Sequence, residues 1–285
     1  MTDLAPLEVL YDAARGDDVP LPASLATLYG HLTFPFHAEG PYVIGNFVSS
    51  LDGVVSLGSP GHKAGGDISG FDEHDRIVMG LLRAVADAVA VGAGTLRSVP
   101  GHLWTAEYVY PPLASEFQRL RSRLDKPGPP LNVIVTASGE LDPGFRVLRS
   151  SEVPVLVVTT ARGAGRIHMH SLPPSVRIAA VTEEGPVSAG AVLEAVRQAG
   201  HGAVVLVEGG PRLMGDFLAE RRLDELFLTL APQIAGRDGK TERPGIVSGK
   251  SFAPEEPLWG TLVAVRRGES HLFLRYSFSP SPALA

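Results

Sequence analysis

The sequence predicts an α/β protein with a mostly parallel central sheet, helices on both faces and an antiparallel hairpin at its carboxyl end. Two observations support this class. Short runs of Val, Ile, Leu and Ala alternate with amphipathic helical segments, and only the last two strands alternate apolar with polar side chains. Continuous apolar strands are typical of parallel strands that helices cover on both faces.

Strands and helices alternate regularly from residue 42 onward. The helix expected at 189–199 follows Ser188, a favoured N-cap, and precedes Gly200, a favoured helix stop. The other helices are identified by a period near 3.6 residues, and the strands by short apolar runs. We expect further helices at 72–85 and 211–221, and strands at 42–49, 86–92, 132–136, 153–160, 176–182, 203–207 and 224–232.

The two ends of the chain depart from this pattern. Residues 261–278 alternate around a short turn, as an antiparallel hairpin does. Residues 1–39 combine several prolines with short apolar patches, which predicts a lead-in segment packed on the main domain. We therefore divide the chain into this lead-in and one α/β domain at 40–280.

The composition favours small molecules as partners. With 285 residues, of which 44% are apolar, the chain can bury a large core. The net charge of −6 and the scattered basic residues argue against a surface for nucleic acid or anionic lipid. No apolar run approaches the roughly 18 residues of a membrane span, and the first thirty residues lack a signal-peptide pattern. We expect a cytoplasmic protein.

The sequence also argues against a metal site. It contains no cysteine, which excludes a thiolate nucleophile and a cysteine zinc site. His37 and Glu39 form an H-x-E pair like that of zinc-dependent nucleobase deaminases, but the P-C-x-x-C partner is missing. His168 and His170 lack a carboxylate at metal-binding spacing. We therefore expect no metal.

Two glycine-bearing turns follow expected parallel strands. One contains Gly92, Gly94 and Thr95, and the other begins at Glu208 and runs through two glycines to Pro211. Bare glycine backbone lets N–H groups approach phosphate oxygens, and a helix N-terminus attracts an anion. Either turn alone is also explained as a tight strand-to-helix connection, and neither has the full G-x-G-x-x-G spacing.

The order and spacing of four segments identify a family resemblance. They are the strand with Asn46, the S-S-L-D-G turn at 49–53, the run LLRAVADAVAVGAGT at 81–95 and LVEGGP at 206–211. Together they resemble the reductase domain of the bifunctional deaminase-reductase of riboflavin biosynthesis, over about residues 40–278. The resemblance implies a dihydrofolate reductase-like fold, NADPH as the cofactor and a homodimer.

The resemblance also implies the residues of a substrate site. Arg83 matches an arginine that binds the ribose phosphate, although a solvated helix residue is the alternative. Asp75, with Arg76, looks like a pair found in stand-alone actinobacterial members, although a first-turn Asp also suits the helix dipole. Asp-Gly at 52–53 is also a common hairpin signal. The implied substrate contacts are Asn46, Ser50, Arg83 and Glu208, and the catalytic candidates are Asp52, Asp75 and Glu208.

The implied cofactor contacts lie at strand ends and in the two glycine turns. Thr160 is a further candidate, and Arg162 is a candidate for the 2′-phosphate of NADPH or an exposed loop residue. The loop and helix start at 210–216 match the segment that holds the pyrophosphate. The expected contacts are Gly92, Gly94, Thr95, Thr136, Ser138, Thr159, Gly209, Gly210, Pro211, Arg212 and Leu213.

Two departures from the family pattern leave the substrate open. After its threonine the family continues into a D-D-P segment that grips the substrate, whereas this chain reads L-R-S-V-P at 96–100. The segment 58–76 is longer and richer in glycine than its counterpart, and it carries His62, Lys63 and Asp67 near the expected mouth of the site. We expect this segment to act as a lid.

The resemblance implies direct hydride transfer from the nicotinamide to a pyrimidine- or pteridine-like substrate. In the family the hydride acceptor is the ribosyl C1′ carbon, reached through an opened Schiff base. Three functions stay open: reduction of 5-amino-6-(5-phosphoribosylamino)uracil, reduction of dihydrofolate or another pterin, and NADPH binding without catalysis.

Overall fold

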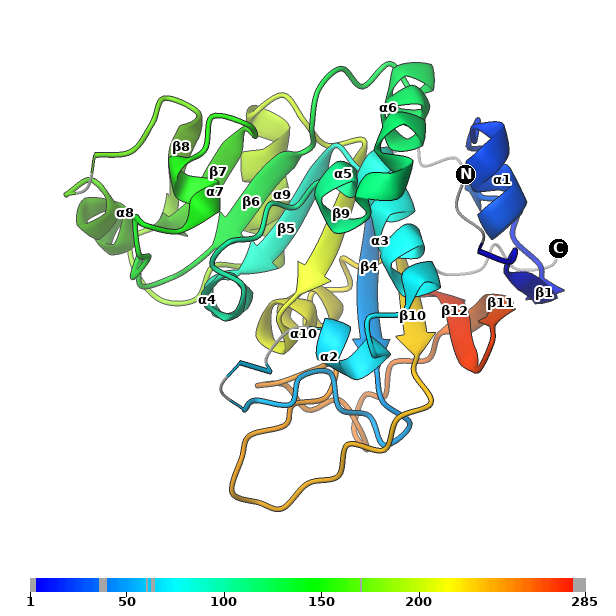
Figure 1. The fold of residues 1–285 in the computed structure, drawn as a ribbon. Helices are drawn as coiled ribbons and strands as arrows, with labels where there is room; N and C mark the ends of the chain where they lie inside the picture. Colours follow the sequence, from blue (N-terminus) through cyan, green and yellow to red (C-terminus); the bar gives the residue numbers. More distant parts are fainter. Residues whose placement is uncertain (1–3, 36–39, 60, 63–64, 170, 279–285) are drawn as a thin grey trace, which may run out of the picture.

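A computed structural model describes residues 4–35, 40–59, 61–62, 65–169 and 171–278 (Figure 1). Within this part of the chain, one ten-stranded sheet runs through the molecule. In order across the sheet the strands are β1 (Glu8–Asp12), β11 (Thr261–Gly268), β12 (His271–Ser277), β10 (Glu225–Leu230), β4 (Tyr42–Ser49), β9 (Val204–Gly209), β5 (Ala88–Gly92), β6 (Leu131–Val135), β7 (Val155–Thr160) and β8 (Val176–Thr182).

Strand directions confirm the predicted fold class. Neighbouring strands from β10 through β8 are parallel, whereas β12, β11 and β1 pair antiparallel at one side. A second sheet pairs β2 (Asp17–Asp18) with β3 (Thr33–Phe34). The hairpin expected at 261–278 is present as β11 and β12.

Helices cover both faces of the sheet (Figure 1). The helical segments are α1 (Ala23–Tyr29), α2 (Gly66–Ser69), α3 (Glu73–Val85), α4 (Ala93–Ser98), α5 (Ala106–Val109), η1 (Pro111–Leu113), α6 (Ala114–Arg123), α7 (Arg146–Arg149), α8 (Ala161–Ile167), α9 (Ala189–Gln198) and α10 (Pro211–Ala219). The Ser188 side chain caps α9, as predicted.

Each face of the sheet has its own apolar core. Strand β5 sends Val89 and Val91 into a core shared with α1, α3 and α6, and sends Ala88 and Ala90 into a core shared with α9 and α10. This division follows from the alternation of side chains along a strand. It explains why the central strands are apolar at nearly every position.

The N-terminal segment is more closely joined to the sheet than the sequence indicates. Strand β1 pairs with β11. Two buried arginines on the last hairpin bind the backbone of the segment that follows β1. Arg266 donates to the carbonyl oxygens of Tyr29 and His31, and Arg275 donates to that of Thr33. Arg275 also pairs with buried Glu225 at 2.7 Å. The boundary at residues 39 and 40 stays a prediction.

Two local expectations are corrected by the backbone. Strand β9 extends through Glu208 and Gly209, because Gly209 still pairs with Val91 of β5. The hairpin alternative for Asp52 and Gly53 is wrong, since the chain leaves the sheet after Ser49 and the residues described between this turn and α2 form no strand. No helix in the described ranges is both long and apolar enough to cross a membrane.

Candidate active site

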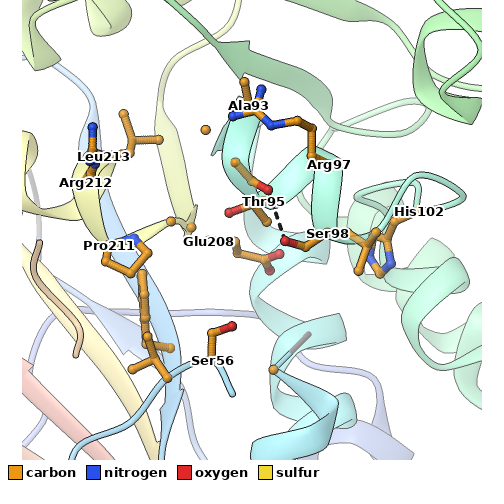
Figure 2. A pocket seen from close by; sticks show the side chains of 18 of the residues that line it. Ser56, Ala93, Thr95, Arg97, Ser98, His102, Glu208, Pro211, Arg212 and Leu213 are labelled. Atoms are coloured by element: carbon orange, nitrogen blue, oxygen red, sulfur yellow. Dashed lines mark hydrogen bonds between the residues drawn. The ribbon is translucent and has the colours of Figure 1, made fainter. Parts of the chain in front are cut away.

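A cavity of about 1430 Å³ opens at the carboxyl ends of β4, β9 and β5 (Figure 2). The chain passes from β4 to β5, and β9 is inserted between them, so the strand order reverses here. Open parallel sheets bind ligands at such a position. The volume exceeds the roughly 300–1,000 Å³ of a typical small-molecule site, which leaves room for two ligands.

The glycine turn after β9 forms one wall of the cavity and packs against Thr95. A Cβ atom at Gly209 would lie 3.0 Å from Thr95 Oγ1, and one at Gly210 would lie 3.2 Å from it. Gly209 also has a φ of +147°, a conformation that L side chains rarely adopt. The two glycines are therefore required for the close approach of this turn to α4.

Two helices begin at the cavity with bare backbone. None of the described side chains caps the start of α4 or α10, whereas Asp72 caps α3 and Ser188 caps α9. Gly92, Gly94, Thr95 and the turn through Leu213 all line the cavity. Uncapped N–H groups at a helix start are suited to phosphate oxygens.

Glu208 lies on the floor of the cavity in a buried ion pair with Arg83. The Arg83 guanidinium donates from Nη2 to Glu208 Oε2 at 2.6 Å, and its Nε lies 2.9 and 3.0 Å from the two carboxylate oxygens. The exposed fractions of the two side chains are 2% and 4%. Figure 2 shows the carboxylate between Pro211 and Ser98. The pair joins α3 to the end of β9 across the site.

The structure gives Arg83 different partners from those implied by the resemblance. Besides Glu208, the guanidinium donates through Nη1 to the carbonyl oxygens of Leu103 and Thr105. It is therefore neither the solvated helix residue of the alternative nor a free phosphate ligand. A phosphate would reach most of its donors only if the pair with Glu208 opened.

Asp75 is a buried carboxyl group in the wall of the same cavity. It lies in the first turn of α3 and is 4% exposed. The pKa of Asp75 is raised to about 6, mainly by burial and also by the negative charge of Asp72, whereas hydrogen bonds from Thr229 and Ser69 and the nearby His271 lower it. Such a group holds a proton closer to neutral pH than an ordinary Asp.

Asp52 and Ser50 do not line the cavity, and the catalytic and binding roles expected for them stay predictions. The Ser50 hydroxyl donates to Asp52 at 2.6 Å, and the backbone N–H groups of Ala235 and Gly236 donate to the same carboxylate. These hydrogen bonds, the one from Ser50 first, lower the pKa of Asp52 to about 2. Both residues stabilise the turn against the loop at 233–243.

Other expected contacts divide between the cavity and the protein interior. Asn46, Thr136 and Ser138 line the cavity. Thr159 does not, because it is completely buried where Gly163 of α8 packs against its hydroxyl. Thr160 caps α8, and Arg162 is exposed beyond the cavity wall.

The segment after Thr95 contributes an aromatic wall that the sequence did not predict. His102 lies with its ring centroid 5.1 Å from that of Trp104 and 4.6 Å from that of Tyr108, and all three residues line the cavity. Burial, with the nearby charges of Arg83 and Arg146, lowers the pKa of His102 to about 2, so the ring is neutral. The only sequence signal was the departure from the family's D-D-P segment.

The segment 58–76 borders the cavity through Gly58, Gly65, Ser69 and Phe71. In this segment the His62 ring lies 2.9 Å from the carboxylate of Asp67. Lys63, like the candidate residues His37, Glu39 and His170, lies outside the described residues. In the part of the chain that the structure describes, no group of three His, Asp or Glu side chains is placed to hold a metal ion.

Comparison with known proteins agrees with this geometry. A model of the RibD C-terminal domain matches residues 41–254. A comparison with curated proteins gave no match. Among solved structures, a pyrimidine reductase-like protein from Corynebacterium diphtheriae is 21% identical, with a TM-score of 0.64, over 83% of this chain and 91% of its own.

Two longer proteins share this fold over part of their length. The diaminohydroxyphosphoribosylaminopyrimidine deaminase/5-amino-6-(5-phosphoribosylamino)uracil reductase of Thermotoga maritima is 23% identical, with a TM-score of 0.60, over 84% of this chain and 56% of its own. RibD of Acinetobacter baumannii is 20% identical, with a TM-score of 0.61, over 84% and 58%. This chain thus spans little more than half of either protein. Because the family model matches residues 41–254, about three quarters of the sequence, the chain belongs to the RibD C-terminal domain family.

Proposed function

We propose that the chain is an NADPH-dependent reductase whose substrate is 5-amino-6-(5-phosphoribosylamino)uracil. The observation that carries this proposal is that one cavity joins two bare helix starts to buried polar groups. The starts of α4 and α10 suit the phosphates of a dinucleotide, whereas Asp75 and Glu208 suit a polar heterocycle. A reductase of a biosynthetic intermediate also fits the cytoplasmic location expected from the sequence.

The residues at the helix starts fit a dinucleotide. Gly209 and Gly210 keep side chains out of the turn, and the uncapped N–H groups after Gly210 are available to a pyrophosphate. When bound, the nicotinamide supplies the hydride. The protein contributes position and polarity, because it holds both ligands at the ends of neighbouring strands.

The buried polar groups fit a proton donor and an anchor for the heterocycle. Of the three catalytic candidates, Asp75 is the best suited to hold and donate a proton near neutral pH, because its pKa is raised. Asp52 does not line the cavity, and Glu208 is paired with Arg83. We assign the proton to Asp75. Glu208 then accepts hydrogen bonds from the N–H groups of the substrate, while Arg83 fixes its orientation.

A second candidate function is the reduction of dihydrofolate or another pterin. The pairing of Arg83 with Glu208 favours it, because the expected ligand for a ribose phosphate is occupied. The neutral aromatic wall around His102 also suits an uncharged ring. The third candidate, NADPH binding without catalysis, predicts nucleotide binding without turnover of any of these substrates.

The proposal predicts that NADPH raises the melting temperature of the protein. A ligand that binds only the folded state stabilises it by mass action, by about 2.7 kcal/mol at a concentration of 100 Kd. Differential scanning fluorimetry with about 1 mM nucleotide, the upper end of common enzyme affinities, checks this. Adenosine is the control, because it lacks the phosphates. An unchanged melting temperature with NADPH would remove the dinucleotide assignment.

We also propose that the protein is a homodimer. Strand β1 lies at the edge of the sheet, and its Val9, Leu10 and Tyr11 are each about half exposed, at 50%, 48% and 46%. Such an edge invites pairing with a second strand. Light scattering at micromolar concentration should give twice the chain mass, and Leu10→Lys should shift it toward the monomer. A monomeric wild-type protein would contradict this proposal and leave the enzymatic one intact.

A further inference from the structure

Among the described residues, the arginines of the cavity wall differ in what they contact. Arg76 donates to the carbonyl oxygen of Val109, and Arg83 is paired with Glu208. Arg97 and Arg212 line the cavity without any hydrogen bond or ion pair to a described residue. Two positive charges therefore remain available to a ligand in the cavity.

The order of the strands gives these two arginines different places along a bound dinucleotide. The polar groups for the substrate come from β4, β9 and α3, and the glycine turns follow β9 and β5. A dinucleotide with its nicotinamide beside Glu208 and its pyrophosphate at the glycine turns therefore extends toward β6. Arg212 lies in the first turn of α10, next to the glycine turn that would hold the pyrophosphate.

Arg97 lies on the β6 side of the cavity. It belongs to the last turn of α4, and its side chain runs back along the helix toward Ala93 (Figure 2). Thr136 and Ser138 follow the end of β6 and line the same cavity. The adenosine half of the dinucleotide would lie among these residues.

The hydroxyl groups beside Arg97 are prepared to donate hydrogen bonds. Thr136 Oγ1 accepts from the N–H of Gly139, and Ser138 Oγ accepts from the N–H of Glu140. Each hydroxyl hydrogen has no acceptor among the described residues, so it is free for a ligand. One guanidinium and two hydroxyl donors are a suitable set for a phosphate dianion.

We propose that Arg97, with Thr136 and Ser138, binds the 2′-phosphate of NADPH and thereby selects NADPH over NADH. This proposal rests on the dinucleotide site proposed above. It also replaces the sequence-based candidate Arg162, since Arg97 lines the cavity and Arg162 does not. Arg162 lies in the first turn of α8, which follows β7, one strand beyond β6. Arg162→Ala is therefore a matched control.

The test is isothermal titration of NADPH and NADH into the wild type, Arg97→Ala and Arg162→Ala. We expect Arg97→Ala to weaken NADPH binding about 10- to 100-fold, the loss of a hydrogen bond to a charged group, and to change NADH binding less than about threefold. Arg162→Ala should change neither. Adenosine 2′,5′-bisphosphate, which carries the 2′-phosphate without the nicotinamide, should lose affinity for Arg97→Ala as NADPH does.

The outcomes separate this inference from the proposed function. Equal affinity of the wild type for NADPH and NADH would overturn the inference and leave the dinucleotide site in place. An unchanged NADPH preference in Arg97→Ala would also overturn it. A loss of that preference in Arg162→Ala would assign the role to Arg162 instead. Failure of both nucleotides to bind the folded wild type would remove the proposed function, and the inference with it.

Discussion

In the Asp75→Asn variant, kcat for the proposed substrate is expected to fall by about 10²- to 10⁴-fold, the usual contribution of a general acid. An amide has nearly the same shape as the carboxyl group but transfers no proton. NADPH affinity should stay nearly unchanged, because Asp75 lies among the substrate groups on α3. Steady-state kinetics and nucleotide titration on the same preparation check both parts.

The pH profile of the wild type gives a second view of Asp75. Because burial raises the pKa of Asp75 to about 6, the proton is lost as the pH rises through that value, and kcat/KM should fall over the same range. This descending limb should be absent from the residual activity of Asp75→Asn. A variant with near wild-type kcat and the same limb would show that Asp75 is not the acid.

Asp72→Asn is the matched control for this prediction. Asp72 lies three residues earlier, outside the cavity, and its side chain caps α3 by accepting from the N–H of Asp75. Asparagine is an equally good cap, so the helix start should be retained. Removing the negative charge of Asp72 lowers the pKa of Asp75, which should move the descending limb to lower pH without abolishing activity.

The Arg83→Met variant is expected to lose about 3–5 kcal/mol of unfolding free energy, because Glu208 is left as a buried carboxylate without its counter-charge. Glu208→Gln should also destabilise the fold, since it leaves the Arg83 charge unpaired. The double variant should lose less than the sum of the two single variants. Urea unfolding at neutral pH without nucleotide measures all three.

Arg146→Met is a suitable control for the ion pair. Arg146 also pairs with a glutamate, Glu152, but the two side chains are 43% and 59% exposed. Exposed pairs contribute about 0–1 kcal/mol, so this variant should unfold almost as the wild type does. A cost below about 1 kcal/mol for Arg83→Met as well would show that the Glu208 pair is not the buried anchor described above.

The same variants test the phosphate role that the family resemblance implies for Arg83. If Arg83 leaves Glu208 to bind the substrate phosphate, Arg83→Met should raise KM for the phosphorylated substrate more than Glu208→Gln does, because only Arg83→Met removes the phosphate ligand. If Arg83 only positions Glu208, both single variants should raise KM together. Comparison of the two KM values therefore distinguishes the two roles.

The order of strands and helices was predictable because it depends on local pattern. The run at 42–49 is mostly apolar, as expected of a strand that is buried on both faces, and Ser188 caps α9 through a contact three residues away. Strand β1 was missed because Val9, Leu10 and Tyr11 lie at an exposed edge. Its pairing with β11 depends on residues more than 250 positions later.

The candidate site was predictable where glycines and strand ends mark it, and less so where long-range pairing decides the role. Glu208 and Arg83 are separated by 125 positions, so no local sequence signal shows that their side chains form an ion pair. Asp52 sits in a matching S-L-D-G turn, yet its carboxylate binds the backbone of a loop that the sequence does not place. The wall around His102 follows a segment in which the family pattern is absent.

The most direct test of the account is NADPH oxidation measured with 5-amino-6-(5-phosphoribosylamino)uracil, dihydrofolate and dihydrobiopterin under the same conditions. The account predicts NADPH-dependent reduction of the ribosylaminouracil phosphate, at a higher kcat/KM than for either pterin, and loss of that activity in Asp75→Asn. Faster reduction of a pterin would transfer the assignment to the second candidate function. Bound NADPH without oxidation by any of the three substrates would contradict the central claim that this cavity is a pyrimidine reductase site.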